Sequence, residues 1–582
     1  MKHNFLLSLL VGTILVTGAC TNSKTTESTL PSYLSAQMAK GTQPSSKGMV
    51  AAANPHAVEA GIAALRAGGS AVDAALAVQT VLGLVEPQSS GIGGGAFMVY
   101  YDAQSGKVTA YNGREKAPST ITETLFIKDD GERMGRFNGT ISGRSTGVPG
   151  MMAMMHMAHT DHGKLTWADG FHVAEKLAEN GFAVSPRMAG IVKGTYEQSL
   201  SLQPAARAYF STADGQPIPE GFLRDNKLYA SSMRALAADP RALYVGPLAQ
   251  AIVDATQAEP RPGTLSLQDM KAYTAQKSEA LCSPYRTYIV CGAQAPSSGG
   301  VAVQSILGQL ENFDMAKLGP SLQGWHVFAE ASAQAYADRD MYVADPDFVE
   351  VPSRALLDPA YLKSRAENIQ MDSALKNVKS GDPVAFKNGK DATPDNPGTS
   401  HFTIVDKWGN VVSMTTTVES AFGNRRMAGG FMLNNQLTDF SWNIHDKDGN
   451  LIANRPSANK RPRSSMAPHI VFDQDGTFAF STGSPGGSSI IAYTAKTIIA
   501  MIDWGMSPQE ATDLTNFISR NGRIRLEEKN MPEEIIIGLE ALGHNVTRSK
   551  GEISGIHIIK RNTDGSYTGS ADPRREGIAK SE

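Results

Sequence analysis

The sequence has few cysteines, no excess of charge of one sign and only a short apolar run near its N-terminus. Its 582 residues include 54 Lys and Arg against 57 Asp and Glu, so the net charge is −3. Proteins that bind nucleic acid carry a basic surface, and this balance argues against such a partner. The apolar run, residues 5–16, is shorter than the roughly 20 residues that a membrane-spanning helix needs. With 41% hydrophobic and 7% aromatic residues, the composition is otherwise that of a globular protein.

The N-terminal residues have the pattern of an export signal. Lys2 precedes the apolar run, and small residues follow it up to Cys20, an arrangement typical of secretory signals. Residues 15–20 resemble a lipobox, in which the cysteine is lipidated and becomes the first residue of the mature chain. We therefore expect a lipoprotein signal peptide at 1–19, a polar tether at 20–46, and a lipid-anchored protein in the periplasm of a Gram-negative bacterium. A plain cleavable signal peptide is the alternative.

The other two cysteines, Cys282 and Cys291, lie on either side of a turn and a strand-like run. Export to an oxidising compartment permits a disulfide between them. Reduced cysteines at facing positions of two strands would have the same spacing. The sequence leaves both alternatives open.

Two motifs that suggest ligand sites have simpler interpretations. Residues 91–95 are rich in glycine, but they precede a predicted strand at 96–101 and lack the Lys-Ser/Thr ending of a phosphate-binding loop. His156, His159 and His162 lie on a predicted methionine-rich helix with no carboxylate or cysteine at ligand spacing. Methionine-rich core packing is the better interpretation of that helix. We expect no metal ion and no cofactor.

The two halves of the chain have different periodicities. Residues 54–86 have apolar positions at helical spacing with one glycine break, which predicts two packed helices. The polar stretch 373–398 has no periodicity and predicts a surface linker. Beyond it strand patterns dominate, and the runs 400–406 and 411–418 flank a turn, which predicts a hairpin.

The start of this hairpin offers a candidate nucleophile. Pairing Asp406 with Asn410 across the turn places Thr399 opposite Thr417. If the linker were cut before Thr399, that residue would gain an α-amino group with a pKa near 7.7–8.0, which can serve as the general base for its own hydroxyl. No Gly-x-Ser-x-Gly or zinc motif competes with this interpretation. By itself, a Gly-Thr pair before a strand is very weak evidence, and an ordinary strand start is the better interpretation.

Four blocks of sequence, in this order, resemble the gamma-glutamyltransferase family. The first reads Gly-Thr-Ser-His-Phe-Thr-Ile-Val-Asp from Gly398, and the last reads Thr-Gly-Ser-Pro-Gly-Gly-Ser from Thr482. The four blocks are residues 398–406, 433–441, 460–468 and 482–488, and the similarity continues at 48–51, 68–75, 113–115, 145–150, 296–300 and 571–575. It therefore covers nearly all of the chain beyond the leader.

The resemblance implies an α+β fold, a four-layer αββα sandwich of the N-terminal nucleophile hydrolase type. It also implies a precursor that cuts itself between Gly398 and Thr399. The products would be a large subunit, 47–398 after the tether, and a small subunit, 399–582. They would remain associated as a heterodimer, because neither piece closes both sheets alone.

The resemblance further implies roles for individual residues. Thr399 is the nucleophile, Thr417 orients its hydroxyl, and Gly486 with Gly487 supplies the oxyanion hole. A guanidinium and two hydroxyls suit a carboxylate. The implied contacts are Arg114, Ser464 and Ser465 to the substrate α-carboxylate, and Gln436 and Asp439 to its α-amino group.

Two features depart from the family pattern. Glu419 stands where relatives usually have Asn, and its carboxylate could either bind the substrate ammonium or repel the substrate carboxylate. Residues 441–459 contain no tyrosine, although a lid tyrosine covers the site in several relatives. Both departures bear on which acyl group the pocket accepts.

The leading interpretation is an exported enzyme that transfers the γ-glutamyl group of glutathione or a similar amide to water or an amino acid through an acyl-Thr intermediate. One alternative is an amidase of different acyl specificity, such as a cephalosporin or glutaryl acylase. The other is a surface lipoprotein that keeps the fold only for binding. In each case we expect membrane contact only through the lipid anchor.

Overall fold

The computed structural model describes residues 47–128, 130–393, 398–549 and 554–582. The expected signal peptide, the Cys20 lipidation site and the tether lie outside the described residues and stay predictions. Within the described ranges, no helix is both long enough and apolar enough to cross a membrane.

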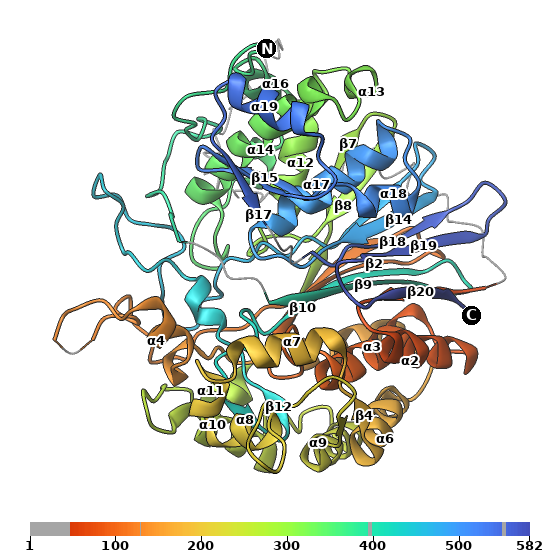
Figure 1. Ribbon diagram of the computed structural model, residues 1–582, viewed down its shortest axis with the longest axis vertical. Helices are drawn as coiled ribbons and strands as arrows, with labels where there is room; N and C mark the ends of the chain where they lie inside the picture. Colours follow the sequence, from red (N-terminus) through yellow and green to blue (C-terminus); the bar gives the residue numbers. More distant parts are fainter. Residues whose placement is uncertain (1–46, 129, 394–397, 550–553) are drawn as a thin grey trace, which may run out of the picture.

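Two antiparallel sheets form the centre of the molecule (Figure 1). The first has the order β20 (Ile578–Ser581), β1 (Met49–Ala52), β9 (Thr399–Val405), β10 (Val411–Thr417), β2 (Gly95–Tyr101), β3 (Val108–Gly113) and β6 (Gln276–Glu279). The second has the order β19 (Tyr567–Ala571), β18 (His557–Arg561), β14 (Phe478–Gly483), β13 (His469–Phe472), β8 (Tyr288–Gly292) and β7 (Leu281–Tyr285). Both sheets combine strands from before and after Gly398, so a cut at that residue would leave two interleaved chains.

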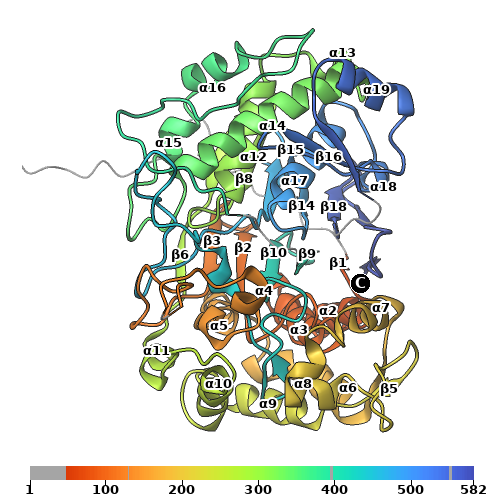
Figure 2. The ribbon, with the colours of Figure 1, turned by 60° about the vertical axis from the view of Figure 1, so that its left-hand side comes forward.

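Helices cover the outer face of each sheet (Figure 2). On the first sheet lie α2 (Pro55–Arg66), α3 (Ala71–Val85) and α5 (Met151–His162). On the second lie α12 (Gly299–Leu310) and α17 (Ser489–Ile502), with α14 (Leu322–Tyr342) packed on α12. The predicted four-layer αββα arrangement is therefore confirmed. Every residue of the alanine-rich α3 is buried, because its small side chains let neighbouring elements approach on all sides.

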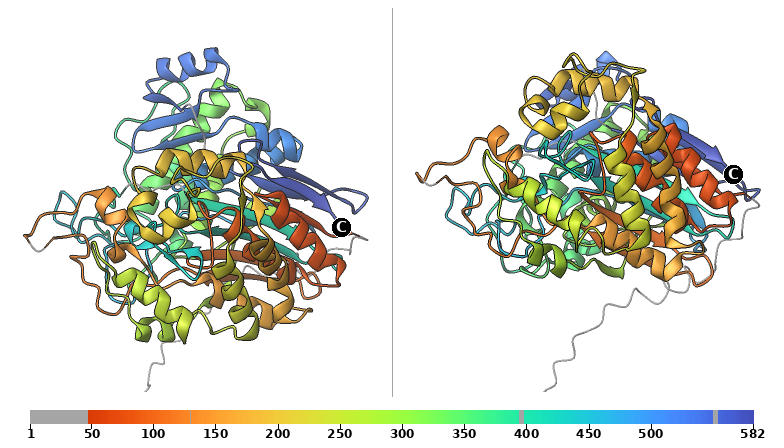
Figure 3. Two further views of the ribbon diagram at one scale, coloured as in Figure 1. Left: turned by 60° about the horizontal axis from the view of Figure 1, so that its bottom comes forward. Right: turned by 90° about the horizontal axis from the view of Figure 1, so that it is seen from below.

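The remaining elements surround these four layers. In Figure 3 the red helices α2 and α3 lie beside the yellow-to-green segment. That segment begins with α6, and α6 packs on α3. The smaller helices are α4 (Arg136–Thr140), α6 (His172–Asn180), α7 (Pro186–Thr195), α8 (Pro204–Tyr209), α9 (Lys227–Ala238), α10 (Pro247–Gln257), α11 (Leu267–Ala272), α13 (Met315–Leu318), α15 (Ser353–Leu356), α16 (Pro359–Ala366), α18 (Pro508–Asp513) and α19 (Glu533–Ala541). The short strands are β4 (Phe182–Ala183), β5 (Leu223–Arg224), β11 (Met427–Ala428), β12 (Phe431–Met432), β15 (Phe517–Arg520), β16 (Arg523–Glu527) and β17 (Val546–Ser549).

The predicted hairpin has the predicted register. The main-chain N–H of Asp406 donates to the carbonyl of Asn410 at 3.1 Å, and Thr399 pairs with Thr417. Side chains alternate along β9. Phe402 packs into the core that contains α2 and α3. Thr403, next to it, faces the second sheet and hydrogen-bonds Ser481 of β14. Thr399 therefore points toward the interface between the two sheets.

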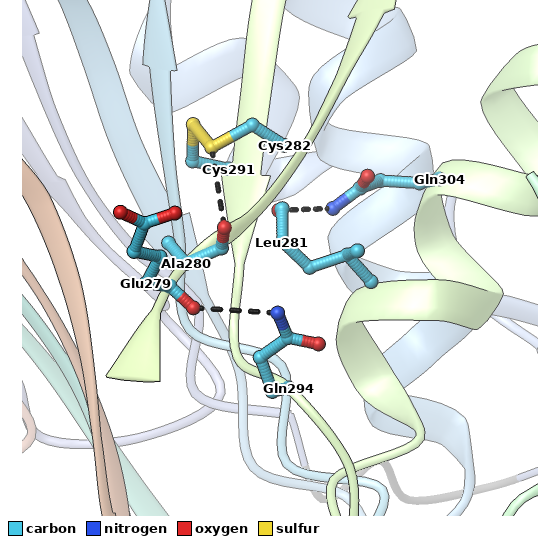
Figure 4. Close-up of a disulfide and its surroundings, with 7 residues drawn as sticks. All are labelled: Glu279, Ala280, Leu281, Cys282, Cys291, Gln294 and Gln304. Carbon is cyan, nitrogen blue, oxygen red and sulfur yellow. Dashed lines mark hydrogen bonds between the residues drawn. A yellow bond between two sulfur atoms is a disulfide. The ribbon is translucent and has the colours of Figure 1, made fainter. Parts of the chain in front are cut away.

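The structure tests two further predictions made from the sequence. Cys282 and Cys291 are paired across β7 and β8 and form a disulfide (Figure 4). In α5 each of the three histidines has its own packing or polar partner. His156 contacts the ring of Trp167, His159 lies 3.1 Å from Asp73, and His162 hydrogen-bonds Tyr111. These contacts agree with the packing interpretation of that helix.

Candidate active site

One pocket brings together most of the residues predicted for the site. They arrive from elements far apart in the sequence: the end of β3, the facing ends of β9 and β10, the turns before β13 and the start of α17. The pocket is lined by Arg114, Thr399, Thr417, Glu419, Gln436, Asp439, Ser464, Ser465 and Gly487, and also by Arg463, Met466 and Ile490. The last three were not predicted.

The nucleophile candidate sits in a short hydrogen-bonded chain. Thr399 Oγ1 donates to Thr417 Oγ1 at 3.3 Å. Thr417 Oγ1 donates in turn to the carbonyl oxygen of Gly398 at 2.6 Å and accepts the N–H of Glu419 at 2.7 Å. The Thr417 hydroxyl thus polarises the carbonyl of the peptide bond that precedes Thr399. A Cβ on Gly398 would lie 2.2 Å from the carbonyl oxygen of Glu419, so only glycine fits at this position.

Gly486 and Gly487 precede α17 with main-chain torsions that other residues rarely adopt. Their φ angles are 138° and 59°, which favours glycine at both positions. Among the described residues, none accepts a hydrogen bond from either main-chain N–H. Gly487 lines the pocket beside Thr399. Unpaired N–H groups at a helix start are suited to hold a developing oxyanion.

The Arg114 guanidinium is held in place by the main chain of the segment before β13. Its Nε donates to the carbonyl of Pro462 at 2.9 Å, and Nη2 donates to the carbonyl of Arg463 at 2.8 Å. Nη2 also pairs with Asp439 Oδ2 at 2.5 Å. Because Arg114 is fully buried, these contacts fix the plane of the guanidinium toward the pocket.

Glu115 does not neutralise Arg114 near pH 7. Its carboxylate lies 3.6 Å from Arg114 Nη1, but complete burial raises the pKa of Glu115 to about 8, although Arg114 acts in the opposite direction. Glu115 is therefore mostly protonated at neutral pH. The positive charge of Arg114 remains for Asp439 and for an anionic ligand.

The other predicted binding residues are held by hydrogen bonds within the pocket wall. Gln436 Nε2 donates to Asp439 Oδ2 at 3.2 Å, within a 3₁₀ turn that spans Gln436–Asp439. Ser464 Oγ accepts the N–H of Met466 at 3.1 Å. Ser465 Oγ accepts from Arg339 Nη2 of α14 at 2.5 Å. Hydroxyls, an amide and charges of both signs thus surround the space in front of Thr399.

Glu419 occupies a constrained position. Its φ is 81°, in the left-handed region where Asn is tolerated better than Glu. Its side chain is 3% exposed, lines the pocket, and accepts a hydrogen bond from Asn435 Nδ2. The Glu419 side chain therefore lies in the same pocket as Arg114 and Asp439.

Arg575 contacts Thr399, and we predicted no role for Arg575. Its Nη1 donates to the carbonyl of Thr399 at 2.8 Å and lies 3.9 Å from Glu86 Oε2. Glu86 also accepts from Ser400 Oγ at 3.1 Å. Burial lowers the pKa of Arg575 to about 9. The only signal in the sequence was the C-terminal block 571–575.

Comparisons with known proteins identify relatives of this chain. The model of the gamma-glutamyltranspeptidase family matches residues 57–581. The chain belongs to this family. It is 34% identical over 547 residues to a glutathione hydrolase proenzyme of Bacillus subtilis (strain 168), covering 91% of each chain. It is 32% identical over 544 residues to an acylase ACY 1 proenzyme of Pseudomonas sp. (strain V22), covering 91% of this chain and 93% of that one. Among solved structures, a cephalosporin acylase from Bacillus halodurans matches with a TM-score of 0.81 and 25% identity, covering 92% of this chain and 95% of that chain.

The family resemblance and the N-terminal nucleophile hydrolase fold are thereby confirmed. The curated relatives include proenzymes of both glutathione hydrolases and acylases. Which acyl group this chain transfers, and the role of each site residue, remain predictions.

Proposed function

We propose that the chain is a self-processing enzyme that transfers γ-glutamyl groups of glutathione and related amides to water or an amino acid. The proposal is based on the set of groups that line the pocket. The pocket places the Thr399 hydroxyl, the main chain of Gly487, the guanidinium groups of Arg114 and Arg463 and two carboxylates around one space. Binding alone would not need the nucleophile and the oxyanion donors.

Self-cleavage uses the contacts around Gly398. Thr399 Oγ1 attacks the Gly398 carbonyl carbon, which the Thr417 hydroxyl polarises. The C–N bond breaks as the ester forms, and the hydroxyl proton passes to the departing nitrogen. Water then hydrolyses the ester and leaves Thr399 with a free amine and hydroxyl. The large subunit, 47–398 beyond the tether, and the small subunit, 399–582, remain interleaved in both sheets.

Acyl transfer repeats the same chemistry on a substrate. The new α-amino group of Thr399, with a pKa near 7.7–8.0, takes the hydroxyl proton. The hydroxyl oxygen attacks the γ-carbonyl, and the N–H groups of Gly486 and Gly487 stabilise the oxyanion. The leaving amine departs with the proton, and water or an acceptor amine then attacks the acyl-Thr ester.

The charges in the pocket favour a γ-glutamyl over a glutaryl group. Both groups carry a terminal carboxylate that Arg114 can bind. Only the γ-glutamyl group adds an ammonium, and Glu419 and Asp439 place two negative charges in the pocket. Arg463 also lines the pocket, but its guanidinium is paired with Asp391, which lies outside the lining. The remaining one positive and two negative groups match a zwitterion better than a lone carboxylate.

The experiment that tests this function compares γ-glutamyl-p-nitroanilide with glutaryl-p-nitroanilide on the purified, cleaved protein. We expect faster hydrolysis of the γ-glutamyl compound. A second candidate, an acylase for substrates without the amino group, is favoured by the full-length match to a cephalosporin acylase. Hydrolysis of the glutaryl compound alone would establish that second candidate and reject the first.

Replacing Arg114 by Ala is expected to lower kcat/KM for γ-glutamyl-p-nitroanilide at least tenfold. Loss of a charge-assisted contact to the substrate carboxylate typically costs about 1.5–3 kcal/mol. Arg234→Ala is the matched control, because Arg234 forms only exposed ion pairs on the surface. Arg114→Lys keeps the charge and tests whether the planar guanidinium is needed. Self-cleavage of each variant shows that it has folded, and wild-type turnover by a cleaved Arg114→Ala enzyme would contradict this role.

Replacing Glu419 by Gln is expected to weaken γ-glutamyl turnover and to leave glutaryl turnover unchanged or improved. The amide keeps the size of the side chain but removes the negative charge that binds the ammonium, at a cost of about tenfold in kcat/KM. Measuring both p-nitroanilides on one preparation gives the ratio directly. An increase in γ-glutamyl turnover would mean that Glu419 repels the substrate carboxylate.

A further inference from the structure

Outside the active-site pocket, a second group of polar side chains joins α14 to the turn after α19. Both helices lie near the top of Figure 1. His326 and Glu330 lie four residues apart on one face of α14. His544 follows α19, where its N–H donates to the Leu539 carbonyl at 3.1 Å. His326 and Glu330 are buried, and the side chain of His544 is 6% exposed. None of the three lines the active-site pocket.

Two of the three side chains in this group, His326 and Glu330, are oriented by a main-chain contact. His326 Nε2 lies 2.6 Å from the carbonyl oxygen of Gln370, which requires the proton on Nε2 and leaves the Nδ1 lone pair toward the group. Glu330 Oε2 accepts the N–H of Leu375 at 2.9 Å, which leaves Oε1 on the side of His544. Metal-binding histidines typically donate their second ring N–H to a carbonyl in this way.

The donor atoms converge at distances that a metal ion can bridge. His326 Nδ1 and His544 Nε2 are 2.7 Å apart, so these are the two ring nitrogens that can share one ion. The other ring nitrogen of His544, Nδ1, is 3.6 Å from Glu330 Oε1. One donor atom from each residue lies within 4.8 Å of the others. Two imidazoles and one carboxylate form a donor set that zinc favours.

We propose that His326, Glu330 and His544 bind one zinc ion that joins α14 to the turn after α19. The zinc takes the place of the proton between the two imidazole rings, and that proton moves from His544 Nε2 to His544 Nδ1, so both rings stay neutral. A solvent molecule completes a tetrahedral coordination sphere. The sequence did not show this site, because 214 residues separate the last two ligands and only the fold brings them together.

The site has a consequence for the processed enzyme, and this consequence rests on the proposed cleavage at Gly398. His326 and Glu330 precede the cut, whereas His544 follows it. Bound zinc would therefore link the large subunit to the small one and oppose their separation.

The test uses full-length protein without a histidine tag, stripped with EDTA and titrated with zinc by calorimetry. We expect one zinc per chain. Glu330→Gln and His544→Ala are expected to bind zinc at least about tenfold more weakly. The control His172→Ala, which removes a largely exposed histidine, should bind like the wild type. Cobalt added to the wild type should give the visible absorption of tetrahedral cobalt, a readout that does not depend on any variant folding.

A wild-type protein that binds no zinc, or variants that bind it equally well, would overturn the proposal. The Thr399→Ala protein should bind zinc as the wild type does, because its ligands are unchanged. A failure of self-cleavage and a failure of zinc binding are therefore distinguishable.

Discussion

Thr399→Ala is expected to yield one uncut chain with γ-glutamyl turnover lowered by at least about 10³-fold. The hydroxyl that attacks the Gly398 carbonyl is the same one that attacks the substrate, so one substitution removes both steps. The main chain around the bond stays in place, because Thr417 Oγ1 still donates to Gly398. Intact mass of the purified protein measures the cleavage, and the wild type should show a small subunit of 184 residues.

The controls separate loss of chemistry from loss of fold. Thr403→Ala removes a hydroxyl from the same strand and face, bonded to Ser481 and to the carbonyl of Val412, and should still be cut. Thr399→Ser keeps a nucleophile and should be cut, at a different rate. An active Thr399→Ala protein, or one that is cut at Gly398, would rule out Thr399 as the nucleophile.

The parts of the site within one hairpin were predictable from the sequence because they depend on local rules. A turn of fixed length sets the register of β9 and β10, and the register places Thr399 opposite Thr417. The helices α2 and α3 followed from apolar spacing in the same way. For these elements the nearest neighbours in sequence carry most of the information.

The hydrophobic periodicity of the sequence cannot predict contacts between segments that are far apart along the chain. The Arg114 guanidinium is fixed by carbonyls near position 462, and Arg575 reaches Thr399 from the other end of the chain. The family resemblance supplied Arg114 but gave Arg575 no role. The disulfide between Cys282 and Cys291 needed the pairing of β7 with β8, which their spacing alone left undecided.

The interface between the sheets also holds three buried histidines that the sequence did not single out. His401 of β9 lies 3.0 Å from Thr415 Oγ1, and its ring centroid is 6.4 Å from that of His557 of β18. His469 of β13 hydrogen-bonds the carbonyl of Ala467. Burial lowers the pKa of His469 and of His557 to about 4. Burial also lowers the pKa of His401 well below its usual value, and for this residue His557 and His469 add to the effect.

These histidines are expected to make the protein lose stability as the pH falls from 6.5 to 4. Above pH 6.5 the rings are neutral in both the folded and the unfolded chain, so they impose no cost. Below it the unfolded chain binds protons that the folded chain excludes, and the free energy of unfolding decreases. Such a histidine has a pKa of about 4 in the folded chain and 6.5 in the unfolded chain. At pH 5 it lowers the free energy of unfolding by about 2 kcal/mol.

Urea unfolding at pH 7 and pH 5 measures this loss, and the uncut Thr399→Ala protein is the suitable background because it unfolds as one chain. In that background, His557→Gln should reduce the difference in unfolding free energy between pH 7 and pH 5 by about 2 kcal/mol, since glutamine does not titrate. His56→Gln is the control, because His56 is exposed at the start of α2 and its replacement should leave the difference unchanged. The test compares how much the free energy of unfolding changes between pH 7 and pH 5. A loss of packing in the His557 variant that is the same at both pH values therefore cancels. If the His557 variant lost as much stability on acidification as its parent, the neutral buried histidine would not be the cause of the acid sensitivity.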